Sequence, residues 1–178
     1  TDPADLDRLY AAVQLRGAGL DVLVANAATA AFVTLEQTTE EHLDQTFGVN
    51  VRGTVLTVQK ALPLLNEGAS VILIGSTAAD RGVEAFGAYA ASKAAVRSFA
   101  RTWSNELKGR GIRVNTISPG WIETLGAAAL YDEETARAVK ELAATTVAKG
   151  RMGSPDEAAS AVAFLASDQS SYLVGSKD

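Results

Sequence analysis

The chain has 178 residues, of which 47% are hydrophobic and 21% are charged, so its length and composition predict one globular domain, residues 1–178, with a hydrophobic core. The absence of cysteine excludes thiol catalysis, disulfide bonds and thiolate metal sites, and the net charge of −5 argues against a nucleic-acid partner, which would select clustered Lys and Arg. Neither a signal peptide nor the run of about 18 apolar residues that a membrane span needs is recognisable, so we expect a cytoplasmic protein with no membrane partner.

The predicted elements alternate between helices and strands. The first is a helix in TDPADLDRLYAAV, because Asp2 is a good N-cap and Pro3 suits the first helical position. Apolar runs typical of strands buried on both faces follow at residues 20–27, 70–76 and 112–120. Helical patterns lie between and after these runs, at residues 38–65, 88–110, 132–148 and 154–167. This order predicts an α/β fold, a doubly wound parallel sheet with helices on both faces.

In a doubly wound sheet, binding and catalytic residues gather beyond the carboxyl ends of the strands. Three short segments fall there, at residues 26–28, 75–76 and 118–124. The turns Gly17-Ala18-Gly19 and Gly109-Arg110-Gly111 do not, because each runs into a strand and opens no helix. We interpret both as ordinary turns and not as phosphate-binding loops.

His42 is the only histidine, and it lies in the polar stretch TTEEHLDQT. We interpret this stretch as a solvated helix face, so a hydrolase triad with a histidine base is not expected. The carboxylates nearby, Glu40, Glu41 and Asp44, lack ligand spacing and suit the start of a helix. We therefore expect no metal site.

Tyr89 and Lys93, in YAASK, are the first candidates for a reactive pair. Residues i and i+4 share a helical face, so both side chains can point into one volume. A free phenol titrates at about pH 10, too high for acid–base work at neutrality, and a neighbouring positive charge lowers that pKa. The spacing indicates a proton-transfer pair, although a single Tyr-x-x-x-Lys also arises by chance.

Two polar residues can complete such a site. Ser76 ends the apolar run VILIG and should emerge at the carboxyl edge of a strand, where its hydroxyl could hold a substrate carbonyl beside Tyr89. A serine in an ordinary strand-ending turn is the alternative. Asn50 lies among apolar neighbours in a helical pattern, which predicts a buried amide that needs hydrogen-bond partners and, taken alone, a structural role.

Taken together, these motifs resemble the short-chain dehydrogenase/reductase family of the classical type, over nearly the whole chain. LDVLVANAA looks like that family's Asn-Ala-Gly strand end, GVNVRGT like its helix with the catalytic Asn, and ILIGST with YAASK like its Ser and Tyr-x-x-x-Lys. IRVNTISPGWIET resembles its Pro-Gly turn, and GRMGSPDEAASAVAFLAS its closing helix. Five motifs in the family's order make the resemblance specific.

The resemblance implies a Rossmann-type fold and NAD- or NADP-dependent hydride transfer between a carbonyl and a secondary alcohol. Tyr89 would be the general acid in reduction and the general base in oxidation. Lys93 would lower the pKa of Tyr89 and bind the ribose hydroxyls of the nicotinamide half. Ser76 would orient the carbonyl, and Asn50 would hold a water in a proton relay.

The same resemblance implies residues that line the dinucleotide and the substrate. Asn26, Ala27 and Ala28 would lie on the adenosine ribose side. The carboxamide would be held by the backbone of Pro119, Gly120 and Ile122 and by the hydroxyl of Thr124. Trp121 and the segment 125–151 would cover the substrate pocket above Ser76 and Tyr89. The apolar side chains of Trp121, Phe86 and residues 127–130 indicate that the substrate pocket is apolar.

The chain departs from the family pattern in ways that bear on binding. Ala28 stands where the family usually has Gly, and we expect it to crowd the cofactor slightly. The family's first three strands, with the Gly-rich pyrophosphate turn, would lie upstream of Thr1, and its last strand beyond Asp178. We therefore expect the chain to be part of a longer enzyme, and the strand at residues 20–25 to form an apolar edge.

Two functions of different classes remain open on the sequence alone. The leading one is an NAD(P)(H)-dependent alcohol dehydrogenase or ketoreductase. The alternative is a catalytically silent interaction protein built on the same sheet, which would bind no dinucleotide. The resemblance also implies a homotetramer or homodimer packed through the helices at residues 47–65 and 89–108. The substrate and the choice between NAD and NADP stay open.

Overall fold

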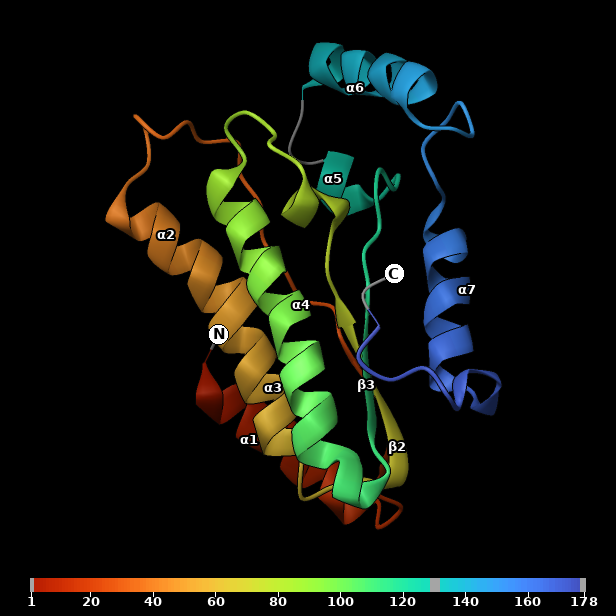
Figure 1. Ribbon diagram of the computed structural model, residues 1–178. Helices are drawn as coiled ribbons and strands as arrows, with labels where there is room; N and C mark the ends of the chain where they lie inside the picture. Colours follow the sequence, from red (N-terminus) through yellow and green to blue (C-terminus); the bar gives the residue numbers. More distant parts are fainter. Residues whose placement is uncertain (1, 129–131, 177–178) are drawn as a thin grey trace.

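The three predicted strands form one parallel sheet in the order β1 (Leu20–Ala25), β2 (Leu65–Ile74) and β3 (Arg113–Ile117) (Figure 1). The computed structural model describes residues 2–128 and 132–176. Val24 pairs with Ile72, and Ile72 with Asn115, so the carboxyl ends of all three strands meet at one edge of the sheet. This edge is where the sequence predicts the functional residues.

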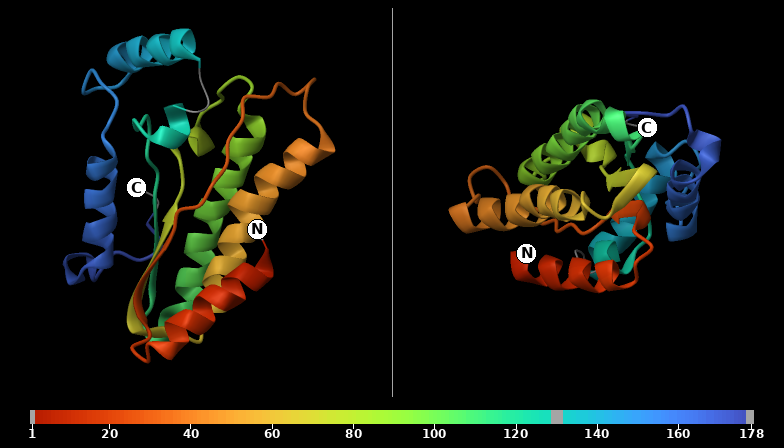
Figure 2. Two further views of the ribbon diagram at one scale, coloured as in Figure 1. Left: turned by 180° about the vertical axis from the view of Figure 1, so that it is seen from behind. Right: turned by 90° about the horizontal axis from the view of Figure 1, so that it is seen from below.

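Helices cover both faces of the sheet, as predicted. One face is covered by α1 (Pro3–Leu15), α3 (Thr54–Ala61) and α4 (Gly87–Leu107), and the other by α7 (Pro155–Ala166) (Figure 2). The larger core cluster fills the first face and includes Tyr10, Val58, Val71, Leu73, Val96 and Val114. Ile72, Ile117 and Leu165 form a smaller one beneath α7. Among the described residues, none of these helices combines the length and the apolar character that crossing a membrane requires.

The helix caps follow the predicted chemistry. The Asp2 carboxylate accepts the Ala4 N–H at 2.9 Å, and Pro3 occupies the first helical position of α1. Asp132 caps α6 (Glu133–Thr146) in the same way, and Ser154 with Glu157 forms a complete capping box at the start of α7. A short helix, α5 (Leu125–Ala128), precedes α6.

The prediction of one long helix at residues 38–65 is wrong at its end. The helix that forms there is also irregular in its middle. Figure 1 shows α2 (Glu40–Phe47) running into α3 through a π-helical turn, Gly48–Gly53, which carries Asn50. The helix stops at Ala61 because Pro63 has no N–H to donate to the next helical hydrogen bond. Leu65, predicted to be helical, is the first residue of β2.

The outer edges of β1 and β3 differ in whether another segment forms hydrogen bonds with them. On β3, Gly175 donates its N–H to Val114 O at 3.0 Å, and Thr116 donates to Ser176 O at 2.9 Å, so residues 175–176 occupy the free edge of this strand. Within the described residues, β1 pairs only with β2, and its Val22 and Val24 side chains stay exposed. The expected apolar edge at residues 20–25 is therefore confirmed.

Candidate active site

Tyr89 and Lys93 lie one turn apart at the start of α4, next to the carboxyl edge of the sheet. Lys93 is only 3% exposed, and its ammonium donates a hydrogen bond of 2.8 Å to the carbonyl of Ile74, the last residue of β2. The same nitrogen lies 5.7 Å from the centroid of the Tyr89 ring. The i, i+4 spacing thus places the phenol and the ammonium side by side, as the sequence predicts.

Ser76 reaches the same point from the end of β2. It caps the short 3₁₀ turn Thr77–Asp80, where its Oγ accepts the Ala78 N–H at 3.1 Å, and its hydroxyl lies close enough to the Tyr89 phenol to act on the pKa of that phenol. The backbone here also meets the turn after β3, because Thr77 donates its N–H to Pro119 O at 3.1 Å. The structure therefore brings two hydroxyl groups and a buried ammonium together.

The ionisation of this pair differs from the sequence-based expectation. Burial raises the pKa of the Tyr89 phenol above its usual value, and the neighbouring Ser76 hydroxyl offsets this only in part. Burial also lowers the pKa of Lys93 from 10.5 to about 8, so about nine tenths of Lys93 is charged at pH 7. The pKa of Tyr89 is therefore raised and not lowered in this structure, with burial as the main cause, and the expected effect of Lys93 on it stays a prediction.

Asn50 is 1% exposed and has the partners that a buried amide needs. Its Nδ2 donates to Thr29 O and to Ser92 Oγ, both at 2.9 Å, and its Oδ1 accepts the Thr29 N–H at 2.8 Å. Ser92 Oγ in turn donates to Tyr89 O at 2.7 Å. The amide therefore clamps the segment after β1 to the first turn of α4, and its expected part in a water relay stays a prediction.

Two phenylalanine rings extend the site away from Ser76. The Phe86 ring stacks on Tyr89 with a centroid separation of 4.4 Å, and the Phe32 ring stacks on Phe86 at 4.6 Å. The sequence suggests Phe86 as an apolar pocket residue, whereas it gives no sign of Phe32. A single aromatic residue in a loop has no periodicity that would mark it.

Comparison with known proteins agrees with this geometry. A family model described as "Enoyl-(Acyl carrier protein) reductase" matches residues 1–177. The chain is 41% identical to oxidoreductase asL5 of Sarocladium schorii, covering 99% of this chain and 70% of that protein. It is 34% identical to the 3-oxoacyl-acyl-carrier-protein reductase FabG of Thermotoga maritima, covering 98% and 70%. The chain belongs to the short-chain dehydrogenase/reductase family.

The fold is that family's Rossmann-type α/β fold. A crystal structure of a short-chain dehydrogenase/reductase from Brucella melitensis matches with a TM-score of 0.91 and 31% identity, over 99% of this chain and 69% of that one. The family is one of oxidoreductases. The chain spans 70% of the length of asL5 and of FabG, so the activity of the whole protein is a matter for proposal.

The residues expected to meet a dinucleotide in this short-chain dehydrogenase/reductase lie along the same edge of the sheet. Asn26, Ala27 and Ala28 are exposed directly after β1, and the backbone of Pro119 and Gly120 follows β3. Within the described residues, no hydrogen bond joins residues 26–28 to Ser76, Tyr89 or Lys93. Their neighbour Thr29 is tied to the helix that carries Tyr89 and Lys93 through the Asn50 amide and Ser92.

The donor set of Lys93 fits the ribose of such a dinucleotide. An ammonium carries three N–H donors. One is used by Ile74 O, and no second hydrogen bond from Nζ is seen to any described residue. Two donors therefore remain for a pair of neighbouring hydroxyl groups. In the part of the chain that the structure describes, no group of three or more His, Cys, Asp or Glu side chains is placed to hold a metal ion.

The segment expected to cover the substrate pocket has its two ends fixed together. Ile122 forms a parallel bridge with Gly153, where Glu123 donates its N–H to Gly153 O at 2.9 Å and Gly153 donates to Trp121 O at 2.8 Å. An ion pair between Glu123 and Lys140 ties α6 to this bridge and lowers the pKa of Glu123. The side chains of residues 127–130, predicted to give an apolar surface, lie outside the described ones, and the predicted roles of Trp121 and Thr124 stay predictions.

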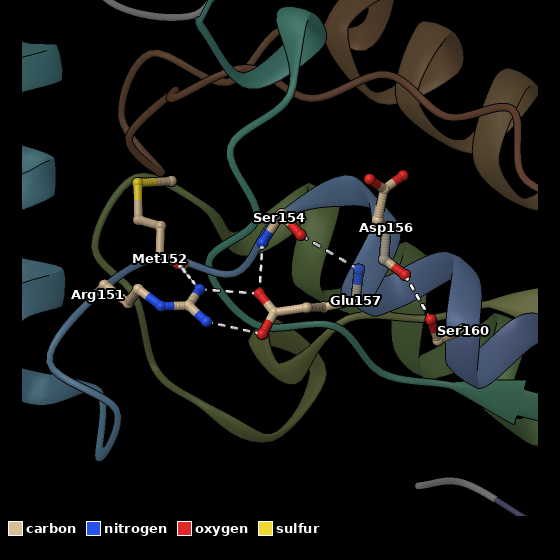
Figure 3. Close-up of polar contacts among 6 residues, drawn as sticks. All are labelled: Arg151, Met152, Ser154, Asp156, Glu157 and Ser160. Carbon is tan, nitrogen blue, oxygen red and sulfur yellow. Dashed lines mark hydrogen bonds and ion pairs between the residues drawn. The ribbon is translucent and has the colours of Figure 1, made fainter.

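Arg151 and Glu157 strengthen the far end of this segment (Figure 3). The guanidinium donates to both carboxylate oxygens of Glu157 at 2.8 Å, and Ser154 donates its backbone N–H to the same carboxylate at 2.8 Å. These donors stabilise the ionised form and lower the pKa of Glu157 from 4.5 to about 2. A neighbouring carboxylate, Asp156, points away from Arg151.

We expect Glu157→Gln to destabilise the protein above pH 4.5 and to lose its effect as the pH falls. The folded-state pKa of Glu157 is depressed, so its stabilising contribution is present above the unfolded value of 4.5 and disappears as the pH falls towards 2. Thermal unfolding of the two proteins across that range measures the difference. Asp156→Asn, in the same helical turn, is the control. A Glu157→Gln difference that does not shrink on acidification would contradict the assignment.

Proposed function

We propose that the protein is an NAD(P)(H)-dependent oxidoreductase that interconverts a carbonyl group and a secondary alcohol. The observation that carries this proposal is the meeting of the Ser76 and Tyr89 hydroxyls beside the buried Lys93 ammonium. Two hydroxyl groups at one point can bind a single carbonyl oxygen. Membership of an oxidoreductase family supports redox chemistry at that oxygen.

In the direction of carbonyl reduction, the residues divide the work as follows. Ser76 donates a hydrogen bond to the substrate oxygen and fixes its position. Tyr89 transfers its phenolic proton to that oxygen as negative charge develops there. The raised pKa of Tyr89 keeps the phenol protonated at neutral pH, which is the form that an acid needs. When bound, a reduced nicotinamide supplies the hydride that the carbonyl carbon receives.

Lys93 has two parts in this scheme. Its two remaining N–H donors suit the ribose hydroxyls of the nicotinamide half, which would position the dinucleotide against the phenol. Its positive charge also stabilises the phenolate that remains after proton transfer. In the oxidation direction, the same phenolate accepts the proton of the alcohol.

The experiment is titration of the full-length protein with NADH and NADPH, followed by assay of reduced-nicotinamide consumption with a panel of carbonyl compounds. Calorimetry should show binding of one or both dinucleotides, and at least one carbonyl should be reduced. If neither dinucleotide gives heat or a thermal shift, the chain is better described as a silent interaction protein on the same fold. The choice of NAD or NADP follows from the relative affinities.

We also infer that the protein assembles with copies of itself through the segments at residues 47–65 and 89–108. Leu43 and Phe47 lie one turn apart on α2 and remain exposed, and a groove beside them is lined by Asp44, Val51 and Arg52. An exposed apolar stripe beside a charged rim suits contact with an identical surface. Light scattering of the full-length protein should give the mass of a dimer or tetramer, and Phe47→Glu should reduce it.

A further inference from the structure

We propose that Phe86 and Phe32 form, with the ring of Tyr89, an aromatic brace that holds the phenol of the general acid against Ser76. In this proposal Phe86 is a positioning residue, and Phe32 supports it from a different loop. The inference rests on the proposed function, because it assumes that Tyr89 transfers the proton. It goes further by assigning a role to two residues outside the reacting groups.

The geometry of the three rings is that of a continuous stack. The planes of Phe86 and Tyr89 are inclined by 30° with centroids 4.4 Å apart, and those of Phe32 and Phe86 by 15° with centroids 4.6 Å apart. These separations lie at the close end of the range for aromatic pairs. Phe86 is therefore in contact with both neighbours, and it cannot move without disturbing Tyr89.

The stack restricts the one motion that would detach the phenol from Ser76. The backbone of Tyr89 is held by Ser92 Oγ, which donates to Tyr89 O, and by the first turn of α4. Rotation about the first side-chain torsion would still swing the ring and carry the hydroxyl away. Phe86 lies against the ring face, so this swing meets a side chain that is itself supported by Phe32.

The backbone holds the two phenylalanines at matching positions. Val33, next to Phe32, donates its N–H to Ala85 O, next to Phe86, at 2.7 Å. Ala85 has φ of 57°, in the left-handed region that non-glycine residues rarely adopt. A strained residue beside the stack indicates that the surroundings fix the direction in which the chain enters α4.

The far end of the brace is anchored by the Asn50 clamp. The Asn50 amide binds both backbone groups of Thr29, three residues before Phe32, and also binds Ser92. The Phe32 side chain is 44% exposed, so burial contributes less to fixing its position than it does for a ring in the core. One buried amide therefore supports the loop that carries Phe32 and the helix turn that carries Tyr89.

The test compares Phe86→Leu and Phe32→Leu with Phe99→Leu in the full-length protein. Phe99 also belongs to a stacked pair, with Trp103 at 4.9 Å, but it packs against the core on α4 away from Ser76.

We expect Phe86→Leu to lower kcat about 10- to 100-fold with KM for the dinucleotide nearly unchanged, since a small displacement of a reacting group has effects of this order. Phe32→Leu should have a smaller effect in the same direction. Phe86→Tyr, which keeps the ring, should restore most of the activity, and Phe99→Leu should leave kcat unchanged.

A second readout is independent of turnover. Carbon-13 labelling at the hydroxyl-bearing carbon of tyrosine gives a signal for Tyr89 that is assigned by its loss in Tyr89→Phe. In Phe86→Leu and Phe32→Leu, the Tyr89 phenol should titrate at lower pH, because its ring becomes more exposed.

If wild type reduces no carbonyl, the proposed function has failed, while this titration still judges the brace. Should Phe86→Leu not fold, Phe32→Leu decides. Wild-type kcat together with an unchanged Tyr89 signal in a folded variant would overturn the brace.

Discussion

Replacing Tyr89 with Phe should lower kcat for carbonyl reduction by about 10²- to 10⁴-fold, the range in which a positioned general acid contributes. The substitution removes only the hydroxyl that lies near Ser76 and leaves the ring that stacks on Phe86. Binding of the dinucleotide should change little, because Lys93 and its bond to Ile74 O are retained. Steady-state kinetics of the full-length protein, with calorimetry of NADH and NADPH, measures both quantities.

A matched control is available within the chain. The Tyr10 phenol is also hydrogen-bonded, donating to Thr57 O at 2.7 Å, but it lies in the core between α1 and α3. Tyr10→Phe should therefore lower stability slightly and leave kcat unchanged. Full activity in Tyr89→Phe would remove Tyr89 as the acid. An equal loss in both variants would show that the effect comes from lost stability and not from lost proton transfer.

Replacing Lys93 with Met should abolish a rise in stability that the wild-type protein shows between about pH 8 and pH 10. Folding lowers the pKa of Lys93 from 10.5 to about 8, so in this window the unfolded state binds more protons than the folded state. Stability then increases with pH, by about 2 kcal/mol across the window. The upper limit is set by Tyr10 and Tyr89, whose raised pKa values lower stability above pH 10.

Chemical denaturation of the dinucleotide-free protein at several pH values measures this slope. Lys108→Met, an exposed position just after the end of α4, should keep the wild-type slope. Lys93→Met should also reduce activity strongly, since it removes the ribose-binding donors and the charge beside the phenol. Identical slopes in wild type and Lys93→Met would mean that the buried ammonium keeps its ordinary pKa in solution.

Much of the fold could be predicted because its signals are local. The three strands are short apolar runs, and the starts of α1 and α7 are marked by side chains that cap the helix within three residues. The error at residues 62–65 has a local cause as well, since Pro63 marks the stop that the hydrophobic pattern concealed. The π-helical turn around Asn50 has no such mark in the sequence.

The candidate site was predictable in its residues and not in its energetics. Ser76, Tyr89 and Lys93 meet because strand ends and a helical repeat determine where they lie. The pKa of Tyr89 depends on how deeply the ring is buried, which no spacing in the sequence reveals. The clamp from Asn50 to Thr29 joins residues 21 positions apart, and the contact of Phe32 with Phe86 joins two loops. Such contacts appear only once the chain is folded.

The bridge between Ile122 and Gly153 has a consequence for how this protein can change. The bridge holds the two ends of the segment between Ile122 and Gly153 together, so this segment is a closed loop. The conformational entropy lost on closing such a loop grows only slowly with its length. Its length and composition can therefore vary while Ser76, Tyr89 and Lys93 keep their places on the sheet. If the proposed function holds, new substrate preferences would arise by exchanging this one segment while the proposed proton-transfer residues stay unchanged.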